Sequence, residues 1–385
     1  MTVYINRLSR FLPNEPVSNE EIETVLGQVH SLPSRTKRLV LKNNGILKRY
    51  YALNRATGEL THTNAALSAQ AVRGLVHESC FGLADIQCLC CGTSTPDVLF
   101  PGHALMVAGE LGLPPLDAVS TAGICISGMT AFKFAFMNVA TGMSDNAVAV
   151  GSELASSFIR AAFFKSPTQS DNALPDADVE KRPVLAFDTD FLRWMLSDGA
   201  GAALLTGSPN PDGISLRIDW IDHLAYAGEL ETCMYGGGIK AKNGKIVGWR
   251  EMEHLPQAKN RNLMAIKQDI RHLEKNIVST MQRTLLACMA RRHLSPDAVD
   301  WFLPHYSSAY FRDRFYTGMT EAGFEVPYDR WFTNLPETGN VGSASIYIIL
   351  EELFASGKLV PGQRLLCFIP ESGRFSHCFM HLTVV

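Results

Sequence analysis

The sequence lacks the long apolar stretches and the excess of basic charge that direct a chain to a membrane or to nucleic acid. No run of about 18 apolar residues occurs, which argues against a membrane-spanning helix. The first residues show no basic segment followed by an apolar one, so no secretory signal is predicted. The formal net charge is only −3 and Lys and Arg are scattered, so neither nucleic acid nor an anionic membrane is an expected partner. We therefore expect a cytoplasmic protein.

The sequence also lacks the cysteine spacing of a disulfide framework or a metal site. Its nine cysteines are odd in number and unevenly spread, whereas disulfide-rich domains are short and use paired cysteines. Cys88, Cys90 and Cys91 cluster, but no second Cys/His pair follows at zinc-ligand spacing. We expect them to be thiols of a buried strand, and no metal is predicted. The glycine-rich segment 231–238 has no Lys-Ser/Thr after it, which argues against a nucleotide P-loop.

Segments of strand length alternate with helical patterns over most of the chain. Buried strands are predicted at 86–91 and 147–152, with helices at 103–111 and 128–142 between them. Such alternation predicts an α/β fold in which crossover helices connect parallel strands.

The length of 385 residues predicts a large unit built of two halves, residues 1–207 and 208–385. A polar, proline-containing stretch at about 156–194 interrupts the first half and predicts a long loop excursion. Helical periodicity is also predicted at 19–30 and at 262–293.

One cysteine, Cys125, stands at the turn between a predicted strand and a predicted helix. The positive end of a helix favours a thiolate, so we expect the pKa of this thiol to be lowered. Gly123, Ser127 and Gly128 leave room for a substrate and free backbone amides for an oxyanion. The alternative is a structural cysteine that packs as a small hydrophobe.

Two downstream polar residues occupy similar positions. His305 directly follows a predicted strand at 300–304, and Asn340 lies in a turn of small residues before a helix. Ligand sites in parallel sheets gather at the carboxyl ends of the strands, so these residues are expected to converge with Cys125. Taken singly, a histidine after a strand is usually a hydrogen-bonded polar residue, and an asparagine in such a turn is most often a turn residue; the three residues together favour a site.

A basic run extends over residues 35–51 and includes Lys37, Arg38, Lys48 and Arg49. Two interpretations are open. The run is either a solvated surface or a docking patch for the phosphates of coenzyme A or of a phosphopantetheine arm on an acyl carrier protein.

The order of these motifs over nearly the whole chain resembles the ketoacyl synthase III branch of the thiolase superfamily. Besides the cysteine turn, the matching segments are 93–101, 197–202, 304–305 and 339–344. The resemblance implies a five-layer α-β-α-β-α sandwich of two similar halves, each with a five-stranded sheet, and a homodimer. It implies acyl-CoA or acyl-carrier-protein thioesters as substrates, with no further cofactor.

The resemblance also implies a Cys-His-Asn site at Cys125, His305 and Asn340. Cys125 would attack an acyl thioester and hold the acyl group. His305 and Asn340 would donate hydrogen bonds to the carbonyl of a malonyl or β-ketoacyl thioester and stabilise its enolate. The backbone N–H of Cys125 and one from the C-terminal loop would hold the oxyanion.

Some segments depart from the family pattern. Tyr306 and the two serines after it replace Gln-Ala-Asn, so contacts to the carrier are expected to differ. The expected glycine-rich stretch becomes 369–377 and keeps only Gly373 as a substrate contact. Glu153 is either a surface or interface carboxylate or a base for a second proton transfer.

These departures favour a role in specialised metabolism. The nearest likeness is to the cyclohexanedione-forming ketosynthases of dialkylresorcinol and stilbene pathways. Two other functions stay open: a thiolase-fold acyltransferase that acts on an oxygen or nitrogen acceptor, and a non-catalytic subunit of the same fold.

Overall fold

The computed structural model describes residues 1–29, 34, 36–76, 81–161, 191–241, 243–251, 263 and 265–385. Arg35 and most of the excursion predicted at about 156–194 lie outside the described residues. Within the described part, every helix is too short or too polar to cross a membrane.

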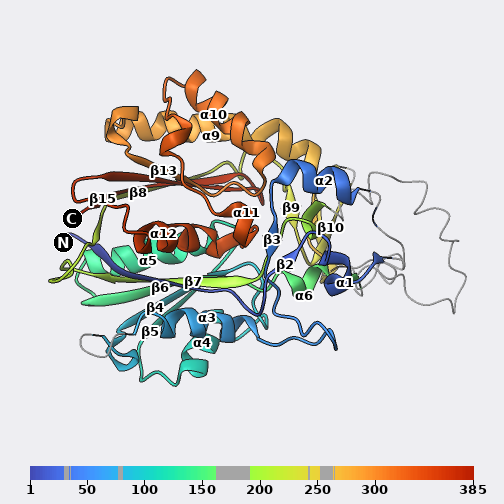
Figure 1. Ribbon diagram of the computed structural model, residues 1–385, viewed down its shortest axis with the longest axis horizontal. Helices are drawn as coiled ribbons and strands as arrows, with labels where there is room; N and C mark the ends of the chain where they lie inside the picture. The colour runs from blue at the N-terminus through green and yellow to red at the C-terminus, as the bar shows by residue number, and fades with distance from the viewer. Residues whose placement is uncertain are drawn as a thin grey trace, which may run out of the picture.

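Helices and strands alternate in five layers (Figure 1). Two outer layers and one central layer are helical, and two layers of strands separate them. From one outer face to the other, the helices are α3 (Asn64–Arg73) and α4 (His103–Leu111), then α5 (Ser127–Ala140) and α12 (Ser345–Ala355), then α9 (Ile270–Arg292) and α10 (Arg312–Glu321). This arrangement confirms the predicted five-layer sandwich.

The two strand layers are connected into one sheet. Its strands are β1 (Tyr4–Phe11), β4 (Cys88–Thr93), β5 (Asp117–Ala122), β6 (Asn146–Glu153), β7 (Gly199–Thr206), β8 (Leu216–Ala225), β13 (Trp301–Pro304), β14 (Arg364–Glu371) and β15 (Ser376–Val384). They lie in the order β13-β14-β15-β8-β1-β7-β6-β4-β5. The two layers join where β1 pairs with β8, at Tyr4 with Arg217 and Ile5 with Leu216.

The two halves differ in strand number. Among the described residues, the first half has five strands in this sheet, β1-β7-β6-β4-β5, whereas the second has four, β13-β14-β15-β8. Beside β13, an isolated parallel bridge joins Phe302 to Trp331. The expectation of five strands in the second half is therefore wrong. The physical reason is space, because only residues 331–334 separate the 3₁₀ helix η8 (Tyr328–Arg330) from α11 (Leu335–Thr338).

Parallel pairing brings the functional loops to one edge of the first half. As predicted, β4 pairs in parallel with both β5 and β6, so Thr93, Ala122 and Glu153 end their strands side by side. The loop that contains Cys125 follows β5 directly. In the second half, β13 and β14 are also parallel, and His305 follows β13.

Close contact between the central helices and the sheet requires glycine. A Cβ atom on Gly128 of α5 would lie 2.2 Å from the Ser343 carbonyl oxygen, and one on Gly151 of β6 would lie 2.4 Å from the same atom. A Cβ on Gly201 of β7 would lie 2.4 Å from Tyr347 Cβ. These contacts pack α12 and the segment before it tightly against the loops of the first half.

Two helices differ from their predicted bounds. Asp269 caps α9 by accepting a hydrogen bond from His272 N at 3.0 Å, so the helix begins at Ile270 and not near 262. Over the described residues 19–29, the single helix is the short α1 (Ile22–Leu26). Gly27 ends it with a φ of +77°, a backbone conformation that glycine adopts without strain.

Short elements surround the functional loops. They are β2 (Val17–Ser18), α2 (Lys37–Asn44), β3 (Lys48–Arg49), α6 (Ser156–Ile159), β9 (Met234–Tyr235), β10 (Gly238–Lys240), β11 (Ile246–Gly248), β12 (Lys267–Gln268) and the 3₁₀ turn η9 (Gly342–Ala344). β12 pairs with β9, and β2 pairs with β3.

Candidate active site

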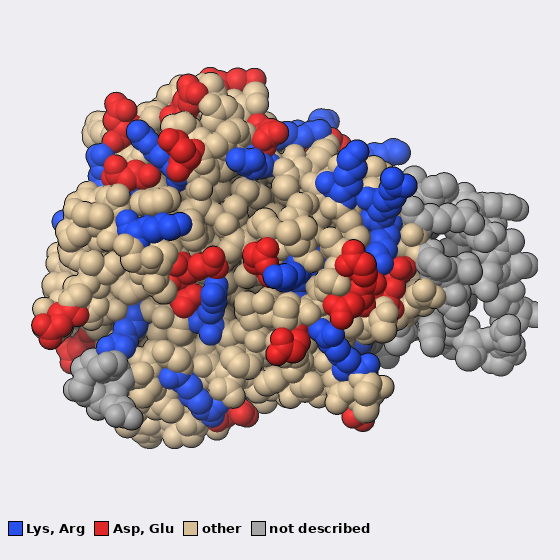
Figure 2. Space-filling view, viewed as in Figure 1, with Lys and Arg blue, Asp and Glu red and all other residues tan. Residues whose placement is uncertain are grey.

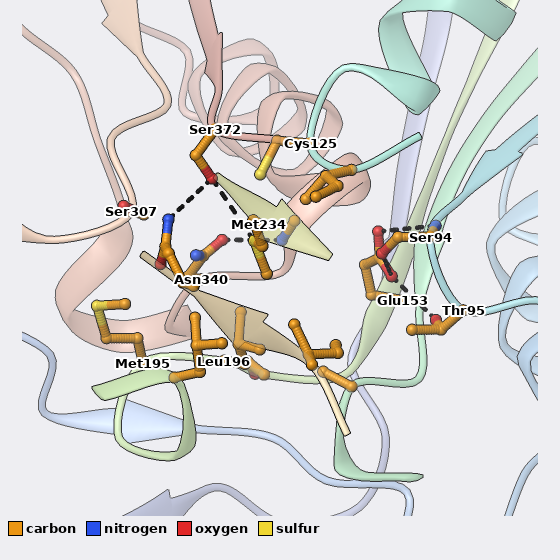
Figure 3. Close-up of a pocket in the computed structure, with 17 residues that line it drawn as sticks. Ser94, Thr95, Cys125, Glu153, Met195, Leu196, Met234, Ser307, Asn340 and Ser372 are labelled. Carbon is orange, nitrogen blue, oxygen red and sulfur yellow. Dashed lines mark hydrogen bonds between the residues drawn. The ribbon is translucent and has the colours of Figure 1, made fainter. Parts of the chain in front are cut away.

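A pocket lies where the loops of the two halves meet (Figure 3). The first half contributes Cys125 and Glu153 to its lining, and the second half contributes Asn340 and Ser372. Figure 3 shows Cys125, Asn340 and Ser372 facing one space. Cys125, Glu153 and Asn340, which the sequence singled out, therefore line one site although they lie far apart along the chain.

Cys125 lies just before α5, and only 8% of it is exposed. Burial raises the pKa of its thiol, and the carboxylates of Glu153 and Glu371 raise it further. This direction is opposite to the predicted one, because desolvation and the two carboxylates penalise the thiolate more than the cysteine's own N–H stabilises it. The resting nucleophile is a thiol, and its proton must leave as it attacks.

Asn340 is held so that its amide nitrogen is left for the pocket. Its backbone N–H donates to Met195 O at 3.0 Å, and its carbonyl accepts from Ser197 N at 2.9 Å. Its Oδ1 accepts from Gly342 N at 2.9 Å within the same turn. Because this bond uses the side-chain oxygen, Nδ2 is the group presented to a substrate (Figure 3).

His305 follows β13 as expected, and its backbone N–H donates to Phe368 O at 2.8 Å. The side chain is 3% exposed, and burial lowers the pKa of the imidazole to about 4. The ring is therefore neutral near pH 7 and offers one donor and one acceptor nitrogen. His305 is not among the residues that line the pocket, whereas Ser307 is.

Glu153 is a buried carboxylate that ties three loops together, so it is not a surface residue. Ser94 Oγ donates to it at 2.6 Å, Thr95 Oγ1 at 2.9 Å, Ser343 N at 3.2 Å and Ser94 N at 3.3 Å. Burial raises the pKa of Glu153, and these hydrogen bonds offset part of the effect.

The turn between β14 and β15 contains a carboxylate that the sequence did not single out. Glu371 accepts hydrogen bonds from the backbone N–H groups of Gly373 at 2.7 Å, Ser376 at 3.2 Å and Arg374 at 3.4 Å. Gly373 was the expected substrate contact in this loop. Its N–H is bound to Glu371 and so is not free to hold an oxyanion, and Gly373 is not among the residues that line the pocket. The replacement of the glycine-rich stretch signalled a change here but not its nature.

Two polar residues of the pocket wall were also missed. Gln268 is 6% exposed, and its Nε2 donates to Ser372 Oγ at 3.0 Å. Gln268 lies on β12, within a segment that the sequence predicted as helix, so no pattern pointed to it.

The basic run separates into exposed and buried members. Arg38 and Lys48 are exposed, and Lys37 pairs with Glu23 at 3.1 Å. Arg49 is fully buried, where its Nε donates to Trp194 O at 3.0 Å. Including Arg49 in a docking patch is therefore wrong, because its guanidinium holds the interior together.

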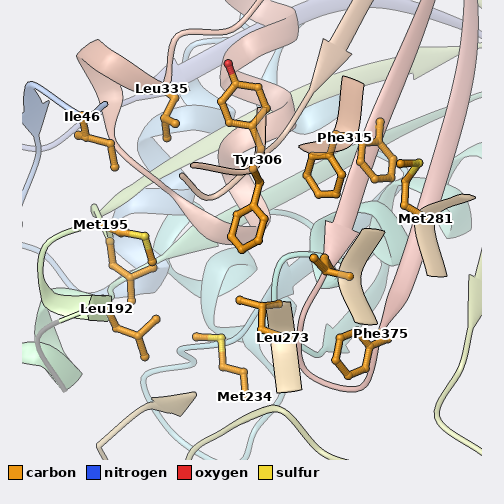
Figure 4. Close-up of a cluster of buried hydrophobic side chains, with 14 of the residues drawn as sticks. Ile46, Leu192, Met195, Met234, Leu273, Met281, Tyr306, Phe315, Leu335 and Phe375 are labelled. Carbon is orange, nitrogen blue, oxygen red and sulfur yellow. The ribbon is translucent and has the colours of Figure 1, made fainter. Parts of the chain in front are cut away.

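Tyr306 lies in the hydrophobic core and not in the pocket wall (Figure 4). It is 5% exposed and belongs to the cluster that includes Ile46, Leu335 and Phe315. Its predicted role as a carrier contact is therefore wrong, since a carrier cannot reach a side chain buried in this cluster.

The cysteine cluster on β4 is buried, as predicted. Cys88, Cys90 and Cys91 are free thiols, with 3.5 Å between the sulfurs of Cys88 and Cys90. Among the described residues, no group of His, Cys, Asp and Glu side chains has the arrangement of a metal site.

Comparisons with known proteins agree with this architecture. Residues 289–369, which contain His305 and Asn340, match the family described as 3-oxoacyl-[acyl-carrier-protein (ACP)] synthase III C terminal. The β-ketoacyl-[acyl-carrier-protein] synthase III of Dinoroseobacter shibae is 25% identical over 359 residues, which cover 93% of this chain and 92% of that protein. The synthase of Allorhizobium ampelinum is 23% identical and covers 92% of this chain and 91% of its own length.

Solved structures match over the whole fold. The tetronic acid condensing enzyme AbyA1 has a TM-score of 0.74 at 19% identity and covers 99% of this chain and 100% of its own. The fold is thiolase-like, of the ketoacyl synthase III type. An OleA variant from Xanthomonas campestris, with bound lauric acid and lauroyl-CoA, has a TM-score of 0.73 at 18% identity, over 100% of this chain and 99% of its own. The synthase III of Aquifex aeolicus reaches 0.69 at 19% identity, over 100% of both chains.

Proposed function

We propose that this ketoacyl synthase III-like chain joins two acyl thioesters through a carbon–carbon bond, with Cys125 as the nucleophile. The observation that carries the proposal is the meeting of Cys125 and Asn340 in one buried pocket. In the first step, Cys125 Sγ attacks an acyl thioester. The carrier's thiol leaves with the cysteine's proton, and the acyl group stays on Cys125.

In the second step, a malonyl or β-ketoacyl thioester enters the pocket. Asn340 Nδ2 donates a hydrogen bond to its thioester carbonyl. The resemblance to the ketoacyl synthase III branch assigns a second donor to the neutral imidazole of His305, two residues before Ser307 of the pocket wall. Loss of CO₂ from the malonyl unit, or of a proton from the β-ketoacyl unit, then leaves an enolate. The enolate carbon attacks the acyl carbonyl, and the bond to Sγ breaks. The Cys125 thiolate then takes a proton from water after decarboxylation or, by way of water, the proton that the β-ketoacyl unit lost.

Intact mass spectrometry after exposure to acyl thioesters tests the first step. We expect the mass to rise by one acyl group in the wild type and in a Cys288→Ala control, which removes a buried cysteine on α9. Cys125→Ala should form no adduct. A stable adduct on Cys125→Ala, or none on the wild type with any donor, would contradict the proposal.

Two other functions make different predictions. An acyltransferase that acts on an oxygen or nitrogen acceptor needs no enolate, so it would release no CO₂ from a malonyl thioester. The orientation of Asn340 Nδ2 toward the pocket supports condensation instead. A non-catalytic subunit would not need a nucleophile, yet Cys125 lines the pocket.

We assign the docking of the substrate's phosphates to the exposed cations of α2 and β3. Arg38, Lys42 and Lys48 are exposed, and Figure 2 shows Lys and Arg gathered over α2. Lys48 pairs at 2.7 Å with Glu337 of α11, the helix that leads to Asn340. Coenzyme A and phosphopantetheine arms both present phosphates that such cations bind.

Charge reversal tests this docking patch. Arg38→Glu with Lys42→Glu should raise the apparent KM for carrier-bound substrate and leave kcat almost unchanged, because only uniform binding is lost. Lys275→Glu, an exposed change on α9, is the matched control. An unchanged KM and kcat at low salt would show that these cations form a solvated surface and not a docking patch.

We also propose that two copies pair along β5. β5 ends the sheet order, and no described strand pairs with its outer edge. Val98, Leu99 and Phe100 precede α4, whose Ala104 N–H donates to Ser120 Oγ of β5 at 2.9 Å, and they are 42%, 67% and 77% exposed. An unpaired edge beside exposed apolar side chains favours association. Light scattering should give twice the chain mass of 42.3 kDa, and a monomer would contradict the pairing.

The specific pathway is a further proposal: specialised metabolism, with ring closure to a cyclohexanedione or alkylresorcinol precursor. Glu153 supports it, because a buried carboxylate of raised pKa beside an acyl-cysteine is suited to take a proton. Glu153→Gln should keep acylation but release a linear product. A full yield of cyclic product from this variant, or only linear product from the wild type, would end the proposal.

A further inference from the structure

One side of the pocket is polar although the wall around it is mostly aliphatic. Ile124, Met195 and Met234 contribute apolar surface, whereas Gln268 and Ser372 present an amide and a hydroxyl. Figure 3 shows Ser372 near both Cys125 and Asn340. Neither Gln268 nor Ser372 has a role in the acyl transfer or the enolate chemistry described above.

The hydrogen bonds of this pair are incomplete. Gln268 Nε2 donates to Ser372 Oγ at 3.0 Å. The Ser372 hydroxyl in turn points to the Met234 sulfur at 3.5 Å, and a thioether is a weak acceptor. Among the described residues, no hydrogen bond engages Gln268 Oε1, although this side chain is only 6% exposed. The pair therefore offers one weakly used donor and one unused acceptor to the pocket.

Both members are held in place from outside the pocket. Glu371 accepts three backbone N–H groups and shapes the turn that carries Ser372. Gln268 pairs with Met234 between β12 and β9. The Cys233 N–H donates to Gly373 O at 2.8 Å and joins β9 to the same turn. A polar group fixed in this way meets a ligand without reorganising.

We infer that Ser372 and Gln268 form a subsite for a hydroxyl group on the acyl chain of the substrate. A hydroxyl accepts a hydrogen bond from Ser372 Oγ–H and donates one to Gln268 Oε1, so it satisfies both free positions. A ketone oxygen can only accept and leaves Gln268 Oε1 unpaired, and an unsubstituted chain leaves both unpaired in a buried site. Since Ser372 and Cys125 line the same pocket, the hydroxyl belongs close to the reacting carbonyl, as in a β-hydroxyacyl thioester.

This inference rests on the proposed acylation of Cys125 and names its donor. The test compares three coenzyme A thioesters of equal chain length, carrying a β-hydroxyacyl, a β-ketoacyl and an unsubstituted acyl group. The rate of adduct formation on Cys125 is followed by intact mass. We expect the β-hydroxyacyl donor to react about tenfold or more faster than the unsubstituted one, because a site built for a hydroxyl rejects a chain without it.

Variants then test whether Ser372 and Gln268 cause the preference for the β-hydroxyacyl donor. Ser372→Ala and Gln268→Leu should bring the ratio of the two rates to within about twofold of one, since each removes one hydrogen bond and unpairs the other partner. Ser372→Thr retains a hydroxyl and should keep the preference. Ser279→Ala, an exposed change on α9, is the matched control.

Equal rates for the hydroxylated and unsubstituted donors in the wild type would overturn the inference without the need for any variant. A preference that survives both Ser372→Ala and Gln268→Leu, or a β-ketoacyl donor that reacts as fast as the β-hydroxyacyl one, would also overturn it. These results leave acylation of Cys125 intact. A failure of every donor to form an adduct would instead overturn the proposed function and this inference with it.

Discussion

The raised pKa of Cys125 predicts an unusual pH dependence for its alkylation. An unperturbed thiol of pKa about 8.5 is roughly 3% thiolate at pH 7, and each unit of increase lowers that fraction tenfold. Burial and two carboxylates move the pKa of Cys125 upward. Its reaction with iodoacetamide should therefore be slow at neutral pH and should rise about tenfold per pH unit through about pH 9 without levelling.

Replacing one of the two carboxylates measures how much its charge contributes to the raised pKa of Cys125. Glu153→Gln keeps the shape of the side chain and its acceptor oxygen but removes the negative charge that opposes the thiolate. A nearby buried charge is worth on the order of one pKa unit, or about 1.4 kcal/mol. We expect alkylation of Cys125 in this variant to be about tenfold faster at the same pH. Glu229→Gln, which neutralises an exposed carboxylate, should change nothing.

Intact mass spectrometry measures the alkylation rate, with Cys125→Ala subtracted to remove the contribution of the other thiols. A wild-type rate that levels off below pH 7 would refute the reasoning, because it would mean that the helix end outweighs burial. An unchanged rate in Glu153→Gln would remove this carboxylate from the explanation.

Further predictions concern the donors, the interior and the packing. Asn340→Ala and His305→Ala should still acylate Cys125 but condense about 10²–10³-fold more slowly, and undiminished malonyl decarboxylation in both would refute their role. Arg49→Ala should lower the free energy of unfolding in urea by about 3 kcal/mol, because it leaves the buried Trp194 carbonyl without this hydrogen bond. An effect confined to the KM for the acyl thioester would indicate a docking role instead. Gly128→Ala should lower the free energy of unfolding by about 2 kcal/mol or more, since its Cβ would lie 2.2 Å from a carbonyl oxygen. Gly109→Ala, whose Cβ has nothing within 4 Å, should leave the stability unchanged or raise it. Similar melting temperatures for both variants would contradict the close packing.

The layer order and the meeting of Cys125 with Asn340 could be predicted from the sequence. The layer order is what the resemblance to the ketoacyl synthase III branch implies. The meeting of the two residues follows from topology, because parallel strands place the loops at their carboxyl ends on one edge. The direction of the Cys125 pKa could not be predicted in this way. The helix end is visible in the sequence, whereas the burial that outweighs it depends on the whole fold.

Neighbouring residues of the same charge lie in different environments, which also depends on the whole fold. Lys48 and Arg49 look alike in a basic run, but successive side chains of β3 point in opposite directions, so Lys48 reaches solvent and Arg49 reaches Trp194. Gln268 could not be predicted as a pocket residue, because β12 is two residues long and precedes a long helix. Such assignments depend on contacts between segments distant in the chain, which periodicity does not reveal.

The most direct test of the central claim is to follow an isotope-labelled malonyl thioester supplied together with an acyl donor. Condensation predicts one labelled CO₂ for each product, and a product whose remaining malonyl carbons are bonded to the donor's carbonyl carbon. Both should disappear in Cys125→Ala. An enzyme that acylates Cys125 but releases no CO₂, and passes its acyl group to an oxygen or nitrogen acceptor, would contradict the account.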